Sequence, residues 1–165
     1  MGYATSGIGT QQHMAGEWLA KLAGIKLLHV PYRGGGQAIT DVVAGQVPLA
    51  FLGSSPLLPH HKSGALKLLA QTTLKRAPTL SSVPTMSESG FAELAIDQWL
   101  GLFAPAGTPQ AIVDRLNAET NKALKDADLL ARFETGALEA VGGTSADFTN
   151  YLKITERLRH RRHRR

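Results

Sequence analysis

The sequence predicts an α/β fold, a parallel sheet covered by helices. Short apolar runs alternate with helical patterns along the first half of the chain, and glycine or proline marks nearly every change between them. This alternation favours parallel strands, because each helix carries the chain back to the same end of the sheet. The 165 residues, 43% of them hydrophobic, are enough for one domain or for one domain and part of another.

The first predicted helix is Gln11–Ala23. Thr10 precedes it as an N-cap, apolar residues recur within it at helical spacing, and Gly24 follows where a left-handed residue ends a helix. The residues directly after Met1 are predicted to form a polar loop. The same signals predict a strand over 25–30, a helix closed by Gly45, a strand over 47–52, a helix from Pro56 to about Gly64, and a strand over 66–72.

The elements predicted beyond residue 72 are less regular. They are a polar loop over 73–84, a short helix over 85–89, an extended strand over 94–104, helices over 108–125 and 126–136, a strand over 138–141, and a last helix opened by a capping box of Thr144 and Asp147. The strand over 94–104 is expected to cross between two lobes. The predicted domains are therefore 1–97, 98–156 and a tail over 157–165.

The net charge of +5 comes from the tail, RLRHRRHRR, which holds six arginines and no acid. Without those six charges the remainder carries −1. Such a tail either is solvated or binds nucleic acid by non-specific charge neutralisation. Because no aromatic residue is interleaved to stack on bases, nucleic acid is not expected as a partner. The chain has no cysteine, so disulfides and thiol chemistry are excluded.

Small and hydroxyl-bearing residues precede several of the predicted helices. A loop between a strand and a helix leaves the first N–H groups of the helix unpaired, at the positive end of its dipole, and such an end favours an anion. In a parallel sheet these loops meet at the carboxyl edge of the strands. The candidate ligand-binding residues are Ser6, Gly7, Gly9, Thr10, Gln11, the run Gly34 to Gly36, and Ser54.

Each candidate also has a purely structural interpretation. Gly-rich loops between strands and helices often form tight turns, and Ser54 also suits a cap for the helix at Pro56. His13 either donates to the anion or finds a local partner. His60 and His61 point about 100° apart on a helix, so they cannot chelate one metal as a pair four residues apart would.

Catalytic and cofactor motifs are absent from the sequence. Neither loop matches the phosphate-binding G-x-x-x-x-G-K-[ST] pattern or the dinucleotide-binding G-x-G-x-x-G pattern. There is no G-x-S-x-G elbow and no Ser/His/Asp grouping. We therefore expect no catalytic residue, no metal and no cofactor. One alternative keeps the same loops for a phosphorylated substrate of an α/β enzyme, but it lacks a general base.

A resemblance to a known family begins at Ser6, in SGIGTQQHMAGEWLAKLAGIKLLHVPYRGGGQAITDVVAGQV. It continues through LPHHKSGALKLLAQTTLKRAPTLSSVPTMSESG, WLGLFAPAGTP, IVDRLNAETNKAL and AVGGTSADF. In this order, over residues 3–156, these runs resemble the Bug/TctC family, the extracytoplasmic solute-binding receptors of bacterial tripartite tricarboxylate transporters.

The resemblance implies a type II periplasmic-binding-protein fold, with two hinged α/β lobes around a cleft for a small carboxylate. Residues 1–97 then correspond to the second lobe and 98–156 to part of the first. Ser6, Gly9, Thr10 and Gln11 resemble the family's anion loop, and Tyr32, Arg33, Gly34 and Gly35 resemble its neighbour. The implied partners are the solute and the membrane subunits of the transporter, and the implied location is the periplasm, although no signal peptide follows Met1.

Two departures from the family pattern lower the expected affinity. The first half of one lobe is absent from this chain, so we expect a truncated receptor that binds at millimolar concentrations or more weakly, or a degenerate one that does not bind. Leu52 and Gly53 also stand where the family often carries an acidic or amide side chain. Apolar surfaces left without their covering strands are expected to favour self-association.

Overall fold

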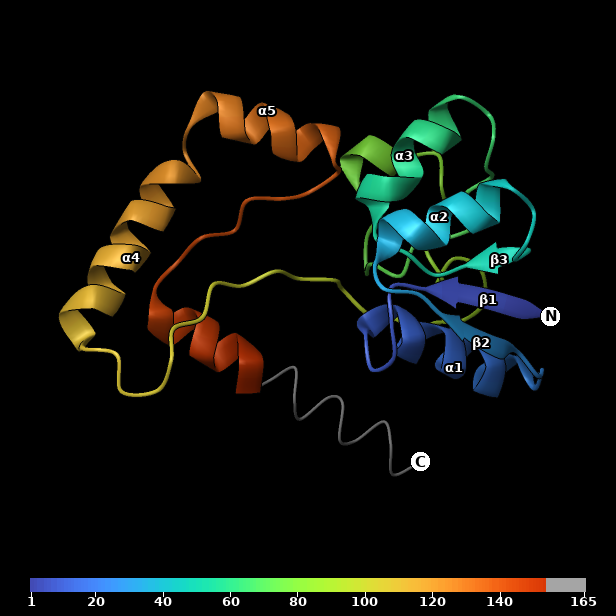
Figure 1. Ribbon diagram of the computed structural model, residues 1–165, viewed down its shortest axis with the longest axis horizontal. Coiled ribbons are helices and arrows are strands. Elements are labelled where there is room, and N and C mark those ends of the chain that lie inside the picture. Colours follow the sequence, from blue (N-terminus) through green and yellow to red (C-terminus); the bar gives the residue numbers. More distant parts are fainter. Residues whose placement is uncertain (154–165) are drawn as a thin grey trace. The chain divides into compact units, whose positions relative to one another are not determined.

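The computed structural model describes residues 1–153, which form two compact units (Figure 1). The first unit is Met1–Leu100 together with Glu134–Leu138, and the second is Gly101–Phe133 together with the chain from Glu139 onward. The Arg-rich tail over 157–165 lies outside the described residues. The change of unit after residue 100 falls three residues beyond the boundary that the sequence predicted.

A three-stranded parallel sheet forms the centre of the first unit. Its strands are β1 (Gly2–Thr5), β2 (Leu28–Pro31) and β3 (Leu49–Ala50), in the order β2-β1-β3. The central strand β1 contradicts the polar loop predicted after Met1. Its glycine and threonine are typical loop residues, but Tyr3, Ala4 and Thr5 are all completely buried. Tertiary burial therefore overrides a weak local signal.

The helices of the first unit cover both faces of the sheet. Tyr3 points to one face, where its ring packs against α1 (Gln11–Ala23) at Gly16. Ala4 points to the opposite face, where it forms a core with Ala38 of α2 (Gly35–Val43) and with Val47. Figure 1 shows α1 on one side of the sheet, and α2 and α3 (Ser54–Lys62) on the other.

Local capping explains why the helix α1 was predicted with its correct bounds. The side chain of Thr10 accepts a hydrogen bond from the N–H of His13 at the start of the helix. At its end Gly24 adopts a left-handed conformation, φ 65°, and its N–H donates to Lys21. Both signals act within one helical turn of the residues that carry them, so they can be recognised without the fold.

Two predicted strands near the end of the first unit do not form. Residues 66–72 contribute only an isolated bridge from Gln71 to Thr85, and residues 94–104 are not assigned to any strand. Thr72 and Ile96 are joined by two hydrogen bonds, from the Ile96 N–H to the Thr72 carbonyl and from the Thr72 hydroxyl to the Ile96 carbonyl. Apolar composition alone does not make a strand, because a strand also needs a ladder partner over several residues.

The predicted short helix over 85–89 forms only a single hydrogen-bonded turn. Its start signal is real: the Thr85 N–H donates to the Glu88 carboxylate at 2.7 Å, and the Glu88 N–H donates to the Thr85 hydroxyl at 3.1 Å. Gly90, with φ 94°, then ends the turn before a helix can propagate. Arg76, which lies before the 3-10 helix η1 (Pro78–Leu80), forms a 2.9 Å ion pair with Glu88.

The second unit contains two helices and a helical segment over residues 145–153. The helices are α4 (Gln110–Ala123) and α5 (Ala127–Thr135), whose last two residues are counted with the first unit. Asp126 caps α5, and Thr144 with Asp147 forms the predicted capping box of the last helix. The strand predicted over 138–141 does not form. None of the described residues from 101 to 153 is buried, so the described part of this unit lacks a core of its own.

Replacing Gly16 by alanine is expected to destabilise the protein. The new methyl group would overlap the buried Tyr3 ring, and overpacking of this kind costs about 1 to 3 kcal/mol. Gly36 is the matched control, since a methyl group there meets nothing within 4 Å. Gly36→Ala should leave the free energy of unfolding unchanged or raise it by about 0.5 to 1 kcal/mol. Urea denaturation measures both, and equal stability of the two variants would contradict the packing of Tyr3 on Gly16.

Glu88 is expected to remain ionised down to about pH 2. The hydrogen bond from Arg76, and then that from the Thr85 backbone, lower the pKa of this carboxyl from 4.5 to about 2. Its contribution to stability is therefore complete above about pH 4.5 and is lost as the pH falls towards 2. A carboxyl-carbon NMR titration measures this pKa. Arg76→Gln should move it back towards 4.5, whereas Arg115→Gln should not change it.

Candidate functional site

Three loops meet at the carboxyl edge of the sheet, where its parallel strands end. They are residues 6–10 after β1, residues 32–34 after β2 and residues 51–53 after β3. The Tyr32 N–H donates to the carbonyl of Thr5, and the Phe51 N–H donates to the carbonyl of Ala4. A methyl group built on Gly7 would lie 3.4 Å from the Tyr32 carbonyl oxygen. The two predicted anion loops are therefore direct neighbours.

The first loop is held in shape by its own side chains. The Thr10 hydroxyl donates to the Gly7 carbonyl at 2.8 Å while it accepts the N–H of His13. The Ser6 hydroxyl donates to the side chain of Gln12 at 2.9 Å. Gly7 and Gly9 have φ values of 145° and 77°, which only glycine adopts without strain. The hydroxyls expected to hold a ligand thus orient the loop, and Gln11 begins the helix directly after it.

The second loop presents the uncapped N-terminus of α2. Gly34 has φ 123° and ψ 164°, a conformation that is essentially restricted to glycine, and no side chain of the described residues caps the helix there. Gly35 is needed because a methyl group on it would lie 3.2 Å from Pro56. The Tyr32 hydroxyl donates to Asp41 at 2.7 Å. That hydrogen bond, with a smaller effect of burial, raises the pKa of Tyr32.

Ser54 is not the cap that the sequence suggested for the third helix, and its role as a ligand donor stays a prediction. Gly53 is the N-cap of α3, and the Ser54 hydroxyl donates to the carbonyl of Gly136 at 3.0 Å. The Ser55 hydroxyl donates to the same carbonyl at 3.0 Å. The position of Ser54 at the third helix start is as expected, but its hydroxyl holds residues 134–138 within the first unit.

Gln98 lies at this edge of the sheet, although no sequence pattern indicated it. Its side-chain oxygen accepts a hydrogen bond from the Gln12 amide at 3.0 Å. The same oxygen would lie 2.7 Å from a methyl group built on Gly53. An amide therefore does reach the loop after β3, where Gly53 itself has no side chain. It comes from a distant part of the sequence, so no local pattern could reveal it.

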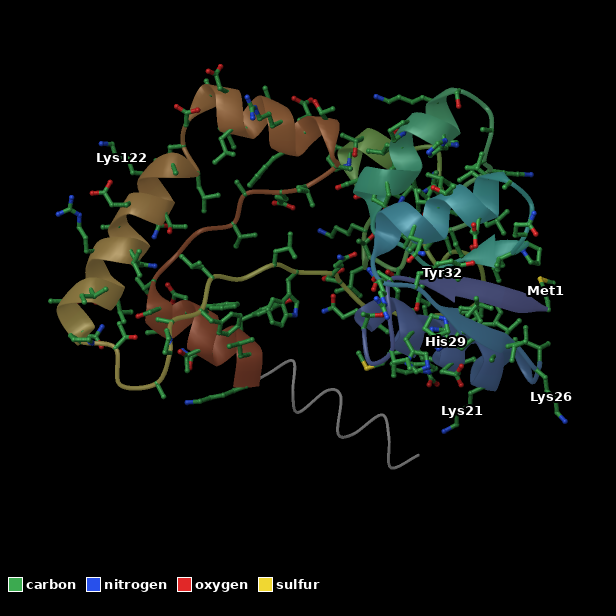
Figure 2. The ribbon with its side chains drawn as sticks, in the orientation of Figure 1. Met1, Lys21, Lys26, His29, Tyr32 and Lys122 are labelled. Carbon is green, nitrogen blue, oxygen red and sulfur yellow. The ribbon has the colours of Figure 1, made fainter. Side chains whose placement is uncertain are left out.

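His13 has found local partners. The Gly9 N–H donates to its Nδ1 at 3.1 Å, and its ring stacks on that of His29. Figure 2 labels His29 on β2. The Tyr3 hydroxyl donates to Glu17 at 2.6 Å on the same side of the sheet. Burial, followed by this hydrogen bond, raises the pKa of Tyr3 above its usual range.

The electrostatics of the edge favour an anion. None of α1, α2 and α3 has an acidic residue in its first turn, so the positive ends of three helix dipoles have no local counter-charge. No group of three or more His, Cys, Asp or Glu side chains among residues 1–153 is arranged to hold a metal. Within the same residues, no helix has the length and apolar character needed to cross a membrane.

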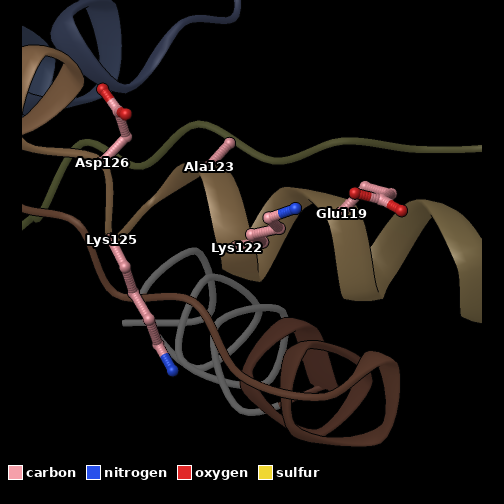
Figure 3. Close-up of a pocket in the computed structure, with 5 residues that line it drawn as sticks. All are labelled: Glu119, Lys122, Ala123, Lys125 and Asp126. Atoms are coloured by element: carbon pink, nitrogen blue, oxygen red, sulfur yellow. The ribbon is translucent and has the colours of Figure 1, made fainter.

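A surface hollow occurs elsewhere, at the carboxyl end of α4 (Figure 3). All of the residues that line it are exposed, and most are charged, so it provides neither shelter from water nor an apolar wall. We assign no ligand to it. Its lining residues are Glu119, Lys122, Ala123, Lys125 and Asp126.

Comparison with known proteins identifies similar receptors and binding proteins. A sequence model of one protein family, the tripartite tricarboxylate transporter family receptor, matches residues 1–162. A Pseudomonas sp. strain P51 protein from the tcbD-tcbE intergenic region is 36% identical over 95% of this chain and 47% of its own length. BugT of Bordetella pertussis is 31% identical over 79% of this chain and 40% of its own length. The chain thus spans about half the length of these relatives.

Solved structures share the fold. A protein of R. palustris with adipate superimposes with a TM-score of 0.88 at 28% identity, over 96% of this chain and 54% of that protein. MatC from Rhodopseudomonas palustris with bound malate superimposes with a TM-score of 0.75 at 29% identity, over 83% of this chain and 47% of MatC. The periplasmic binding protein BugD superimposes with a TM-score of 0.82 at 29% identity, over 97% of this chain and 54% of BugD. The predicted periplasmic-binding-protein type of α/β fold is confirmed, and the matches are to binding proteins rather than enzymes.

Thr10→Ala is expected to lower the free energy of unfolding by about 1 to 2 kcal/mol. The change removes both the cap on the His13 N–H and the hydrogen bond to the Gly7 carbonyl. Thr10→Ser keeps the hydroxyl, so its free energy of unfolding should fall much less. Urea denaturation of the three proteins measures the difference. If the alanine and serine variants have the same free energy of unfolding, the hydroxyl does not hold this loop.

Proposed function

The chain belongs to the tripartite tricarboxylate transporter receptor family, and on that premise we propose that it binds a small carboxylate at the carboxyl edge of β1, β2 and β3. The wider proposal is that it captures this solute in the periplasm for the membrane subunits of a tripartite transporter. In this proposal residues 1–97 are the second, ligand-binding lobe, and residues 98–156 belong to the first lobe.

One observation carries the proposal: three helix N-termini without acidic first turns open at the same edge of one sheet. The loops before α1 and α2 touch, because the Tyr32 N–H donates to Thr5 and Gly7 lies against the Tyr32 carbonyl. A carboxylate placed there would accept N–H groups from both helices and gain from both dipoles. The proposed contacts are backbone groups of Ser6, Gly7, Gly9, Thr10, Gln11, Gly34 and Gly35, with Tyr32 and Ser54 as supports.

The solved neighbours support the class of ligand. One contains adipate and another contains malate, two molecules of different length that share terminal carboxylates. Backbone N–H groups recognise the carboxylate and are indifferent to the rest of such a molecule, because they carry no variable side chain. We therefore propose the carboxylate as the recognised group.

The proposed affinity of this chain is low. Binding proteins gain affinity when two lobes close and exclude water from the ligand. Donors that stay open to water contribute only about 0.5 to 1.5 kcal/mol each, and a few of them give a dissociation constant of about 1 mM or weaker. Exposed apolar side chains of the second unit, such as Leu102, Phe103 and Val141, also favour self-association in this proposal.

Binding can be tested by adding malate or adipate to the 15N-labelled chain. We expect the amide signals of residues 6–12 and 34–36 to shift, with a dissociation constant of about 1 mM or weaker. Gly9→Asp should abolish these shifts, because it adds a negative charge to the loop at a position with no atom within 4 Å of the new side chain's first carbon. Asp and Asn carry the same strain at the Gly9 φ of 77°, and they tolerate a positive φ better than other side chains do.

Gly9→Asn is the matched control, since it has nearly the shape of the aspartate variant without its charge, and it should retain binding. The uncharged diamide of malic acid should shift none of these signals. Shifts that occur only outside the three loops, or equal binding by the two variants, would refute the site. A micromolar dissociation constant would show instead that one lobe suffices for tight binding.

A further inference from the structure

Two histidine rings stack beside the first anion loop. His13 lies on α1 and His29 on β2, with ring centroids 3.9 Å apart and planes inclined by 14°. Both side chains are partly buried. The rings come from elements 16 residues apart in the sequence, and the fold brings them together next to residues 5–9.

Each ring is hydrogen-bonded to this loop. Nδ1 of His13 accepts the N–H of Gly9 at 3.1 Å. Nε2 of His29 lies 2.7 Å from the Thr5 hydroxyl oxygen, and that oxygen accepts the N–H of Gly7 at 3.2 Å. The pair therefore contacts one backbone N–H of the loop directly, that of Gly9, and a second, that of Gly7, through the Thr5 hydroxyl.

The hydrogen bond from Gly9 requires a neutral His13. An imidazole accepts a hydrogen bond only through the nitrogen that carries no proton. Protonation places a hydrogen on Nδ1, so this bond breaks and the Gly9 N–H becomes available to another acceptor. The same event creates a positive charge next to the loop. An anion in the loop gains a donor and a counter-charge together.

The surroundings of the pair allow one added proton rather than two. Glu17 of α1, whose carboxylate accepts the Tyr3 hydroxyl of β1, supplies a negative charge on this side of the sheet. Burial, and then the nearness of His13, hold the pKa of His29 below its usual value. His29 therefore resists protonation, and because two stacked cations would repel each other, the pair accepts one proton rather than two.

We propose that anion binding to the loop over residues 6–10 is coupled to the uptake of one proton by the His13–His29 pair, with His13 as the positioning residue that releases the Gly9 N–H. This inference rests on the proposed function. By linkage, the affinity for a carboxylate rises as the pH falls and the pair takes up its proton.

The first test needs no ligand. In the free protein, the Gly9 amide signal and the His13 ring signals should change with the same midpoint in an NMR pH titration. His13→Asn places an amide oxygen where Nδ1 lies, so it keeps an acceptor for Gly9 but does not titrate. The Gly9 signal of this variant should be constant between about pH 6 and 8, where unbound carboxylates remain ionised. If the Gly9 signal of the unaltered chain does not change together with the His13 ring signals, the inference is overturned.

The second test uses malate as the probe. Its affinity should be about three- to tenfold higher at pH 6 than at pH 8, and a tenfold change corresponds to a shift of one pKa unit. Calorimetry in two buffers of different ionisation enthalpy should show proton uptake. His13→Asn should bind malate with the same affinity at both pH values. His60→Asn, in the last turn of α3, should keep the dependence of the unaltered chain.

The outcomes separate the two proposals. Malate binding that is equal at both pH values leaves the proposed function intact and overturns the proton linkage. Malate binding that fails at both pH values overturns the proposed function and this inference with it. A pH dependence that persists in His13→Asn assigns the effect to another group and overturns the role of His13.

Discussion

The burial of β1 between two parallel neighbours is the constraint on which the candidate site depends. Tyr3, Ala4 and Thr5 are completely buried, and their backbone is paired with β2 on one side and β3 on the other. Because all three strands run the same way, their carboxyl ends lie at a single edge. The loops that follow them must then start next to one another, whatever residues they contain.

The alternation of β1 also fixes which helix covers which face. Tyr3 fills the space beneath α1, where only glycine fits at position 16, and Ala4 leaves room for the close approach of α2 through Ala38. A large residue on one face and a small one on the other thus set the distances of two helices from the sheet. Those distances determine where the N-termini of α1 and α2 open, so the geometry of the loops follows from the packing of two adjacent side chains.

Sequence alone was sufficient where the signal was local. The caps at Thr10, Gly24 and Asp126 place the ends of α1 and α5 to within a residue, because each acts within one turn of its helix. The position of the first two loops at one edge was also expected, although the strand β1 that brings them together was not predicted. The family resemblance, carried by ordered runs along the chain, is confirmed by the match over residues 1–162.

Sequence alone failed where a structure depends on distant partners. The strand β1 looks like a loop until its burial is known, and the apolar run over 94–104 looks like a strand although no ladder partner is present among the described residues. The same limit applies to side chains. Gln98 reaches Gly53 from 45 positions away, and Ser54 is bound to Gly136, a contact across 82 positions. No periodicity or cap predicts contacts of this length.

The side-chain hydroxyls at this edge are already committed to the protein's own structure. Thr10 donates to Gly7, Ser6 to Gln12, Tyr32 to Asp41 and Ser54 to Gly136. A ligand that displaced one of them would leave a polar partner unsatisfied, at a cost of about 1 to 3 kcal/mol. The donors that remain are backbone N–H groups oriented by the helices, and that of Gly9 becomes available when His13 releases it. Preorganisation of the edge therefore comes from its hydroxyls, and its attraction for anions comes from its backbone.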